Sequence, residues 1–326
     1  MAFTNDLTSM THRHPYTIGT PGQHWGALEL AQWRARQMRQ RSYADDVLGA
    51  VERLRERFDV ATYGEVVYGE GEFGDVHYPV ERFPLWAIRS RHWNAALPTV
   101  LVTGGVHGYE TSGVQGALRF VDAHAAEYAS RVNLLVVPCV SPWAYERIQR
   151  WNFDAIDPNR SFREASPAQE SAALMRMVEP LRGQWAAHID LHETTDSDES
   201  EFRPALAARD GKPFEPGSIP DGFYLVDDTA NPQPEFQQAI IQAVARVTHI
   251  APADDKNEII GSPAVAQGVI RYAMKALGLC ASITGARYTT TTEVYPDSPS
   301  ATPEQCIAAQ VTAVCAALGF LSEMGR

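Results

Sequence analysis

The chain has 326 residues and a formal net charge of −12 at pH 7, with 44% hydrophobic and 21% charged residues. This composition is that of an ordinary globular protein and excludes a largely disordered chain. The acidic balance disfavours nucleic acid as a partner, because its phosphates require clustered lysines and arginines. No apolar run approaches the ~20 residues that a membrane-spanning helix needs, so we expect no membrane partner.

The N-terminus and the cysteines bear on the compartment. Residues 1–7 contain neither a basic nor an apolar stretch, so we expect no signal peptide. Cys139, Cys280, Cys306 and Cys315 form no C-x-x-C pair, which argues against a zinc ribbon or a redox motif. We therefore predict buried thiols in a reducing, cytoplasmic compartment. The sequence carries no repeat and no sign of an oligomeric state.

Apolar periodicity predicts alternating helices and strands after a polar arm. We place an irregular N-terminal arm at residues 1–24 and assign residues 25–326 to one domain. The predicted elements, in chain order, are a helix carrying Val47, Val51, Leu54 and Phe58; strands at 64–68, 85–89 and 98–103; a helix at 111–127; a strand at 132–138; a helix opened by a capping box at 166–169; a strand at 185–191; a helix opening at Asn231–Pro232; a strand at 288–294; and a helix opened by a capping box at 302–305.

The strand at 98–103, the helix at 111–127 and the strand at 132–138 form a unit that is typical of parallel sheets. The predicted fold class is therefore α/β, a single domain with a mixed, mostly parallel sheet flanked by helices. The segment 211–221 is rich in Pro and Gly, and we interpret it as a functional loop rather than a domain boundary.

The segment Gly69–Gly74 matches G-x-G-x-x-G, the pattern of a dinucleotide-binding turn. Such a site needs a helix to begin at the turn, so that the helix N-terminus meets the pyrophosphate. Here an extended stretch with Pro79 follows, and two glutamates inside the loop would repel phosphate. We therefore predict a β-turn and no nicotinamide site.

A stronger candidate for chemistry is the segment Gly104–Glu110, directly after the strand at 98–103. Its glycines end the strand, and His107 and Glu110 lie three residues apart, which places them on one face of a helical turn. An imidazole nitrogen and a carboxylate oxygen can then bind one metal ion. A surface histidine beside a helix-capping glutamate gives the same pattern, so both interpretations stay open for this segment alone.

A third ligand is predicted in the strand at 185–191 and its continuation. His188, Asp190 and His192 project to one face of the strand. His192 lies where the apolar run stops, and ligands of open α/β sheets bind beyond the carboxyl ends of strands. His188 lies deeper and is predicted to be a hydrogen-bonded core residue. Two histidines and one glutamate leave a fourth position of zinc open for water, as in catalytic sites.

Two further segments carry polar groups toward the same edge. Arg150, Asn159 and Arg160 follow the strand at 132–138 and are suited to hold a carboxylate, since guanidinium binds it in bidentate fashion. The alternative is a loop held together by pairing of Asp157 with Arg160. Glu293 lies in a Thr-rich strand, where it is either a general base beside the metal or an exposed residue of an edge strand.

Together these segments resemble the zinc metallocarboxypeptidase family of carboxypeptidase A. The matching motifs are short but stand in the family's order along the chain: His107-x-x-Glu110, Asp157-Pro158-Asn159-Arg160, Asp190-Leu191-His192 and Thr292-Glu293. The resemblance spans residues 107–293 and implies the family's fold.

The resemblance also implies roles for the residues. His107, Glu110 and His192 would bind one zinc ion, and Asp157 would orient His107. Asn159 and Arg160 would hold the terminal carboxylate of the substrate. Arg150, placed as in the family's cytosolic branch, would hold the developing oxyanion, and Glu293 would activate the zinc-bound water.

The family also uses a tyrosine that closes over the substrate. We assign this role to Tyr272, although Tyr288 and Tyr224 lie in the same region and Tyr272 fits a core position equally well. We interpret the acidic segment 196–201 as a solvated loop; the alternative is a rim of the site that favours basic substrates.

The nearest alternative is an amidohydrolase of the aspartoacylase/succinylglutamate desuccinylase branch, whose signature resembles residues 190–195. About a hundred residues before His107, and a chain after Glu293 sufficient for only one helix, disfavour it. The expected substrate is thus a peptide or acylated amino acid with a free carboxylate. A remote alternative is an inactive zinc-binding interaction module, which Arg150, Glu293 and the open ligand position disfavour.

Overall fold

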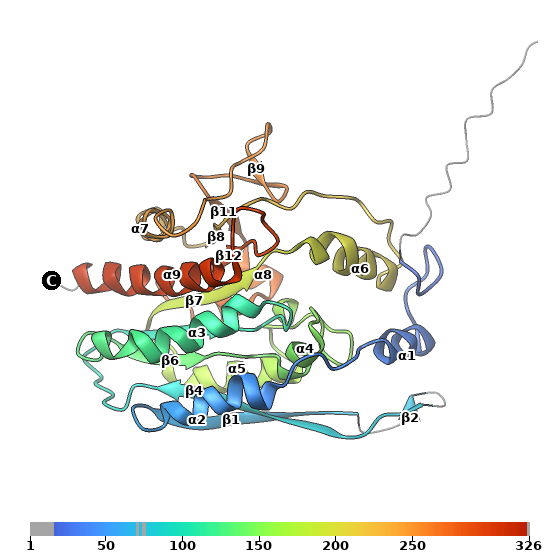
Figure 1. Cartoon of the computed structure of the whole chain (residues 1–326), viewed down its shortest axis with the longest axis horizontal. Helices are drawn as coiled ribbons and strands as arrows, with labels where there is room; N and C mark the ends of the chain where they lie inside the picture. The colour runs from blue at the N-terminus through green and yellow to red at the C-terminus, as the bar shows by residue number, and fades with distance from the viewer. Residues whose placement is uncertain (1–15, 70–71, 74–75, 325–326) are drawn as a thin grey trace, which may run out of the picture.

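An eight-stranded mixed sheet runs through the middle of the molecule, with helices on both faces (Figure 1). The computed structural model describes residues 16–69, 72–73 and 76–324. Four strand pairings are parallel and three are antiparallel, which confirms the predicted α/β class with a mixed, mostly parallel sheet. In spatial order the strands are β1 (Asp59–Tyr68), β4 (Glu81–Arg89), β6 (Asn133–Val137), β5 (Thr99–Gly104), β7 (Trp185–Glu193), β12 (Tyr288–Val294), β8 (Tyr224–Asp228) and β11 (Val269–Tyr272).

Alternating side chains of the central strands fill a core on each face of the sheet. Val100 and Val102 of β5 join the cluster beneath α3, while Leu101 joins the cluster beneath α5. One face carries α2 (Gly49–Leu54), α3 (Thr111–Ala123), α7 (Pro234–Val244) and α9 (Pro303–Met324), and the other carries α5 (Gln169–Val178). The remaining α-helices of the described residues are α1 (Ala27–Ala35), α4 (Pro142–Arg147), α6 (Arg203–Arg209) and α8 (Met274–Leu277).

Short elements connect these layers. Two of them are π-helical, η1 (Ala44–Leu48) and η5 (Asp198–Phe202). The 3-10 turns are η2 (Ala125–Tyr128), η3 (Pro158–Arg160), η4 (Glu179–Leu181) and η6 (Cys280–Ser282). Two small hairpins are formed by β2 (Glu72–Phe73) with β3 (Val76–His77) and by β9 (Glu258–Ile259) with β10 (Ser262–Pro263).

Some of the predicted helix and strand bounds agree with the structure, and others differ from it by a few residues. The strand predicted at 288–294 is β12 with the same bounds, and the capping box at 302–305 is confirmed. Thr302 Oγ1 accepts from the N–H of Gln305 at 3.2 Å, and the Gln305 side chain accepts from the N–H of Thr302 at 2.9 Å. The helix predicted at 111–127 breaks after Ala123, where His124 leaves the helical conformation and η2 follows.

The capping box predicted at 166–169 is wrong, because α5 begins only at Gln169. The side chain of Gln169 bonds instead to both backbone groups of Val67, at 3.0 and 2.9 Å, on the outer edge of β1. It thereby satisfies polar groups that an edge strand leaves unpaired. The start predicted at Asn231–Pro232 is two residues early: Pro234 begins α7, and a residue before proline, here Gln233, disfavours the helical conformation.

The predicted first helix is split. Val47 lies in η1, Val51 and Leu54 lie in α2, and Phe58 lies beyond the end of α2, yet all four side chains are buried. The strands β8 and β11 and the helices α4 and α6 were not predicted. The segment 212–220 forms no helix or strand, which agrees with the predicted loop.

Two segments fall partly outside the described residues. Of the predicted arm, residues 1–15 lie outside them, and within residues 16–24 His24 forms a bridge to Asp210. Residues 70–71 and 74–75 of the glycine-rich segment also lie outside, and β3 rather than a helix follows it.

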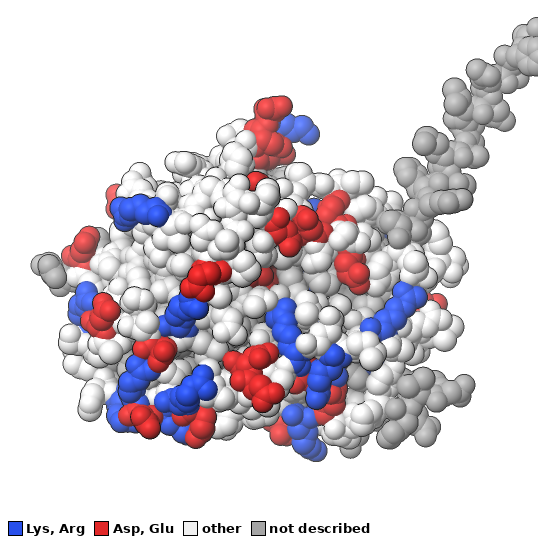
Figure 2. Space-filling model, viewed as in Figure 1, with Lys and Arg blue, Asp and Glu red and all other residues white. Residues whose placement is uncertain are grey.

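Helix α9 is long and apolar enough to cross a membrane by length and composition, over Pro303–Glu323. Half of that window is buried in the fold, where α9 packs between α3 and α7 and against β12. Its apolar character is therefore accounted for by the core. On the face drawn in Figure 2, basic side chains lie beside acidic ones. Exposed ion pairs of the fold include Arg57–Asp122, Arg82–Glu65 and Arg119–Glu304.

Candidate metal centre and substrate cavity

Three of the predicted site residues, His107, His192 and Glu293, lie at the carboxyl ends of the parallel strands β5, β7 and β12. His107 follows β5, while His192 of β7 and Glu293 of β12 are partners in the strand pairing. The turn after β5 requires glycine at two positions. Gly105 has a φ of +60°, and a Cβ on Gly108 would lie 1.9 Å from the carbonyl carbon of Ala144. This close approach places His107 and Glu110 over the end of β7.

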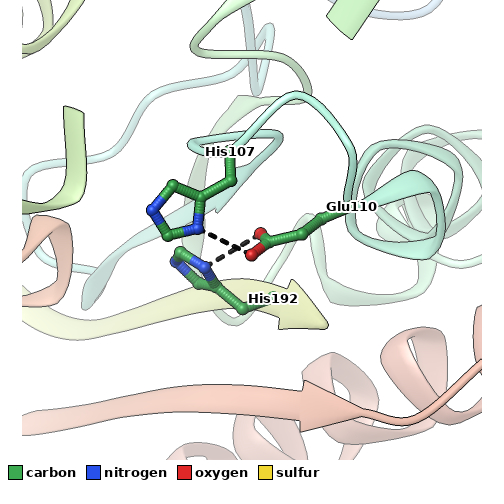
Figure 3. A group of neighbouring side chains, drawn as sticks. All are labelled: His107, Glu110 and His192. Atoms are coloured by element: carbon green, nitrogen blue, oxygen red, sulfur yellow. Dashed lines mark hydrogen bonds and ion pairs between the residues drawn. The ribbon is translucent and has the colours of Figure 1, made fainter. Parts of the chain in front are cut away.

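His107, Glu110 and His192 converge on one point (Figure 3). The Nδ1 atom of His107 lies 2.7 Å from Glu110 Oε1, and that of His192 lies 2.9 Å from Glu110 Oε2. The three side chains are at most 2% exposed, so the alternative of a surface histidine at position 107 is wrong. Two imidazole nitrogens and a carboxylate are ligands that zinc prefers.

Both histidines are held from behind by carboxylates. His107 Nε2 lies 3.0 Å from Asp157 Oδ1, and His192 Nε2 lies 2.8 Å from Asp190 Oδ2. A carboxylate accepts hydrogen bonds, so each Nε2 carries a proton and each Nδ1 of a neutral ring presents its lone pair to Glu110. Lone pairs facing a carboxylate at these distances repel it unless positive charge lies between them. The donor set therefore fits a metal cation.

The pKa shifts of His192 and Glu110 also indicate a site that stabilises positive charge. Burial disfavours charge on His192, yet the carboxylates of Glu110 and Asp190 raise the pKa of this imidazole well above its ordinary value. Burial also opposes ionisation of Glu110, and the imidazoles of His192 and His107 nevertheless lower its pKa. The arrangement stabilises positive charge at the centre of the three side chains.

A buried network lies beneath the three ligands. Thr103 donates to Asp190 at 2.6 Å and shares a hydrogen bond of 2.9 Å with His188, which is the buried core residue that the sequence predicts. Gln310 of α9 donates to the backbone carbonyl of His192 at 2.8 Å and accepts from Thr292 at 2.5 Å. These bonds fix the ends of β7 and β12 relative to each other.

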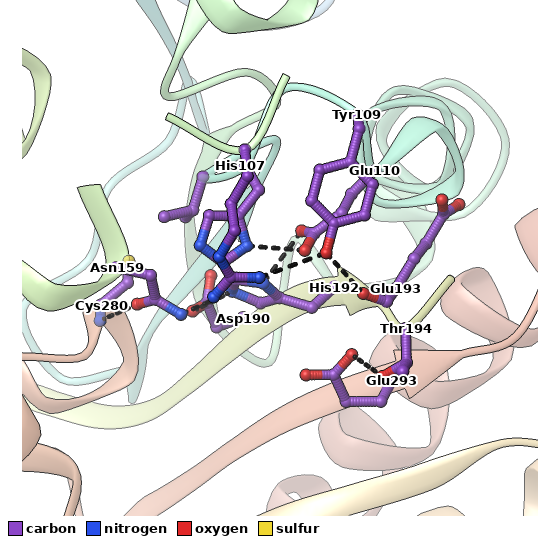
Figure 4. Close-up of polar contacts among 12 residues, drawn as sticks. His107, Tyr109, Glu110, Asn159, Asp190, His192, Glu193, Thr194, Cys280 and Glu293 are labelled. Atoms are coloured by element: carbon purple, nitrogen blue, oxygen red, sulfur yellow. Dashed lines mark hydrogen bonds and ion pairs between the residues drawn. The ribbon is translucent and has the colours of Figure 1, made fainter. Parts of the chain in front are cut away.

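Asn159 and Arg160 lie beside the ligands. Asn159 accepts from the backbone N–H of Cys280 at 2.7 Å, and its amide nitrogen lies 3.5 Å from His192 Nε2 (Figure 4). Arg160 is exposed and lines the cavity, with one of its nitrogens donating to the backbone carbonyl of Asn159. Asp157 pairs with Arg150 at 3.0 Å, which replaces the pairing with Arg160 that we weighed.

Arg150 is held by two carboxylates and a tyrosine. Besides Asp157, it contacts Asp198 at 3.2 Å and the Tyr109 hydroxyl at 3.3 Å. The Tyr109 hydroxyl in turn donates to Asp198 at 3.0 Å. The backbone N–H of Thr195 also donates to the Asp198 carboxylate, at 2.9 Å. The prediction of a solvated loop at 196–201 is therefore wrong for Asp198, although Asp196 and Ser200 are exposed as predicted. Asp198 opens η5 and is buried, because its charge is matched by Arg150.

Glu293 lies on a central strand and lines the cavity, so the alternative of an edge-strand glutamate is wrong. Its Oε2 accepts from the Thr194 hydroxyl at 2.9 Å (Figure 4). The Thr194 hydroxyl also bonds to the Tyr224 hydroxyl at 2.7 Å. Burial raises the pKa of the Glu293 carboxyl to about 8. A cation bound by the neighbouring ligands would favour its carboxylate form.

The three candidate tyrosines occupy different places. Tyr272, at the end of β11, lines the cavity, and so does Tyr224, whose hydroxyl is tied to Thr194. Tyr288 packs on Phe236 and Phe320 and is not among the cavity residues. Tyr272 thus keeps a position that allows contact with a substrate.

One cavity of about 700 Å³ is lined by most of these side chains, namely His107, Tyr109, Glu110, Arg150, Asp157, Asn159, Arg160, His192, Thr194, Asp198, Tyr224, Tyr272 and Glu293. We name the end of the cavity that holds the three candidate ligands, Arg150 and Glu293 its metal end; the far rim is formed by residues of the N-terminal segment, η5 and α6. A cavity of this volume is large enough for a small-molecule ligand such as a short peptide. The rim residues are His24, Trp25, Leu30, Phe202, Arg203, Leu206 and Arg209.

Sequence reasoning missed the roles of Asp190 and Asp198 in the site. Asp190 orients His192 as Asp157 orients His107, and its place two residues before His192 on the same strand face was the available signal. Asp198 had no such signal, since its partners are distant in the sequence.

Comparisons with known proteins bear on these observations. Residues 96–210 match the family model described as "Succinylglutamate desuccinylase/Aspartoacylase catalytic domain", and no curated protein matches the chain. Among solved structures, a "putative metallopeptidase" from Shewanella amazonensis is 20% identical with a TM-score of 0.62, over 88% of this chain and 99% of that one.

Two further structures extend this result. A metallo-carboxypeptidase from Burkholderia cenocepacia has a TM-score of 0.56 at 16% identity, over 86% of this chain and 68% of its own. Carboxypeptidase A from Helicoverpa armigera has a TM-score of 0.56 at 14% identity, over 90% and 78%. The chain has the metallocarboxypeptidase fold.

This metallocarboxypeptidase fold and the matched catalytic-domain model confirm the resemblance that the motifs indicate. With the convergent His, Glu and His side chains, they support a metal-dependent hydrolase of the carboxypeptidase or succinylglutamate desuccinylase/aspartoacylase type.

Proposed function

We propose that the protein is a zinc metallocarboxypeptidase, which hydrolyses an amide bond next to a free carboxylate. The observation that carries this proposal is the set of side chains that meet in this one cavity. It combines the His107, Glu110 and His192 ligand set with Glu293 on one side and the exposed cation of Arg160 on another. Among the groups that line the cavity, Arg160 has the position and charge to select a carboxylate.

The chemistry divides among the residues. One zinc ion bound by His107, Glu110 and His192 would supply Lewis acidity and lower the pKa of a water molecule. Glu293 accepts a proton from the attacking water and passes it to the leaving amine, as the carbon–nitrogen bond breaks. Thr194 holds the Glu293 carboxylate in place through its hydroxyl.

Arg150 and the clamp orient the substrate. The guanidinium of Arg150, fixed by Asp157 and Asp198, provides a preorganised positive charge for the developing oxyanion. Arg160 and the amide group of Asn159 bind the substrate carboxylate, so that the neighbouring amide bond meets the metal. Tyr272 at the cavity wall then covers the bound residue.

A second candidate function is supported by a separate observation. The family model that matches residues 96–210 describes enzymes named for N-acyl amino acid substrates, so hydrolysis of an acylated amino acid is the alternative. The clamp and the ligands serve both reactions. The cavity favours a peptide, because it continues past the metal end to Trp25 and Leu30.

A substrate panel separates the two functions. Zinc-loaded protein is assayed on a dipeptide with a blocked N-terminus and a free carboxylate, on its C-terminally amidated twin and on N-acetyl amino acids. We expect hydrolysis of the free dipeptide at least a hundredfold faster than that of the amide. Much faster cleavage of N-acetyl amino acids would favour the amidohydrolase, and equal rates on the amidated twin would contradict the carboxylate clamp.

The proposal includes the cellular compartment of the enzyme. All four cysteines are free, and three of them are buried, which supports a reducing compartment. We therefore propose proteolysis or amide hydrolysis in the cytoplasm, by a catalytic unit within residues 25–326.

A further inference from the structure

Gln310 of α9 joins the strand of a candidate ligand to the strand of the candidate base. Its side-chain nitrogen donates to the backbone carbonyl of His192 at 2.8 Å, and its oxygen accepts from the Thr292 hydroxyl at 2.5 Å. Thr292 directly precedes Glu293, which is the partner of His192 in the pairing of β12 with β7. One amide group therefore links the ends of the two strands at the point where the ligand and the base stand side by side.

The fold leaves room for this side chain. Helix α9 lies along α3 and packs against β7 and β12 (Figure 1). A Cβ on Gly116 of α3 would lie 2.6 Å from the Cβ of Gln310, so the contact requires glycine. The Gln310 nitrogen also donates at 3.4 Å to the hydroxyl of Ser112, in the first turn of the helix that follows Glu110. The glutamine thus reaches the segment of a second candidate ligand.

A glutamine is an unusual residue for this core position. Its neighbours Ala309, Ala313 and Val314 on α9 are buried and apolar, and Gln310 itself is 0% exposed. Glutamine is mostly exposed in folded proteins, and a buried polar group that lacks partners costs free energy. Packing alone would be served by an apolar side chain, so the polar contacts of Gln310 call for another reason.

A second glutamine offers an internal comparison. Gln237 of α7, which is 1% exposed, donates to the backbone carbonyl of Thr289 at 2.9 Å and accepts from the Thr290 hydroxyl at 2.7 Å. Thr290 and Thr292 are two residues apart on β12 and face the same side of the sheet. The partners of Gln237 lie toward the amino end of β12, and neither Gln237 nor Thr290 lines the cavity. The two glutamines therefore match in burial and bonding and differ in their distance from the site.

We propose that Gln310 is a positioning residue, which fixes His192 and Glu293 relative to each other. It acts through the backbone of the ligand and the hydroxyl of Thr292. The inference rests on the proposed function, since it takes Glu293 as the base. It makes α9 a part of the catalytic unit, although this helix lies beyond the residues that match the family model.

The test compares Gln310→Met with Gln237→Met. Methionine keeps the length of the side chain and removes its hydrogen bonds, so both variants should lose similar stability in urea unfolding of chelator-treated protein. On a free-carboxylate dipeptide, Gln310→Met should lower kcat by about tenfold with little change in KM, because a misplaced base slows the chemical step. Gln237→Met should keep the kcat of wild type.

A milder pair of variants applies if Gln310→Met does not fold. Valine has nearly the shape of threonine but lacks the hydroxyl that reaches the glutamine. Thr292→Val should lower kcat by roughly threefold, whereas Thr290→Val should not change it. Where Gln310→Met does fold, adding Thr292→Val should slow it no further, because both substitutions break one contact.

Cobalt binding gives a readout that needs no turnover. Co²⁺ bound at His107, Glu110 and His192 absorbs visible light according to the geometry of its ligands. Gln310→Met should shift that spectrum and weaken Co²⁺ binding by about tenfold, the lower range for residues that orient ligands, and Gln237→Met should do neither. This result in a protein that cleaves neither peptides nor acylated amino acids would contradict the proposed function and still support the positioning role. Equal kcat values in the two methionine variants or, without activity, equal cobalt spectra would overturn it.

Discussion

Two parts of the cavity are built on different principles. At the metal end, the charged side chains of Glu110, Asp157 and Asp190 are buried, and each lies within hydrogen-bonding distance of an imidazole. Along the apolar wall, Val226 and Ile260 line the cavity with apolar surface, and the turn of the β9–β10 hairpin holds an unfavourable backbone conformation.

This difference separates chemistry from selectivity. Buried charges that are matched on every side keep one geometry, because moving any of them leaves another unpaired. The apolar wall has no such constraint and tolerates changes of size and shape. Substitutions at the metal end should therefore abolish the reaction, whereas those at the wall should change which substrate reacts.

The largest effect is expected from His107→Ala. Loss of one of three ligands leaves Glu110 and His192 without a complete donor set, so bound zinc and hydrolysis should fall below detection together. Metal analysis of the purified variant beside wild type provides the measurement. Full zinc occupancy in this variant would show that the metal lies elsewhere.

Glu293→Gln should separate metal binding from catalysis. The amide cannot accept the proton, so kcat should fall by about a thousandfold, within the range of general-base effects. Zinc content should be that of wild type, because Glu293 contacts Thr194 and is not one of the three convergent side chains. A variant with near-normal kcat would exclude Glu293 as the base.

Arg160→Ala should raise KM by roughly tenfold to a hundredfold for substrates with a free carboxylate, since a charge-assisted hydrogen bond is lost. The same variant should leave the slow hydrolysis of amidated substrates unchanged. Initial rates on the paired substrates measure both effects, and equal losses on the two would count against a carboxylate clamp.

Asp198→Asn tests the fixation of Arg150. The variant keeps the shape of the side chain but removes the charge that faces Arg150 at 3.2 Å, so kcat should fall about tenfold with little change in KM. Tyr109→Phe, which removes a neutral contact to the same guanidinium, serves as the milder control. No change in kcat for Asp198→Asn would mean that Asp157 alone positions Arg150.

The smallest effect on activity at neutral pH is expected from His188→Gln, whose consequence is a change in acid stability. Burial lowers the pKa of His188 to about 4, below its ordinary 6.5, so the fold favours the neutral ring. This contribution is complete above pH 6.5 and is lost as the pH falls toward 4, by roughly 3 kcal/mol.

Urea unfolding of chelator-treated protein between pH 6.5 and pH 4 measures that effect. The variant should lose less stability over this interval than wild type, because glutamine does not ionise. His124→Gln, at a half-buried surface position, is the control and should follow wild type more closely than His188→Gln does. Identical slopes for His188→Gln and wild type would contradict a buried neutral His188.

Local patterns were sufficient to predict that His107, Glu110 and His192 converge. Strand ends are marked by where apolar runs stop, as at His192, and spacing within one turn brings His107 to Glu110. The bounds of β12 were predicted for the same reason, since a run of Thr and Val residues favours a strand.

The rest of the site depends on contacts between distant segments. Asp198 is buried only because Arg150, 48 positions away, and Tyr109, 89 positions away, reach it. Residues 196–201 by themselves have the composition of a solvated loop. The turn at Ile260 could not be predicted from the sequence either, because a β-branched residue disfavours the left-handed conformation that it adopts there.

Zinc titration of chelator-stripped protein tests the central claim most directly. The account predicts uptake of one zinc ion per chain, with hydrolysis of a free-carboxylate dipeptide restored in proportion to the zinc bound. Hydrolysis that persists after stripping, or zinc uptake that restores no hydrolysis of peptides or acylated amino acids, would contradict it.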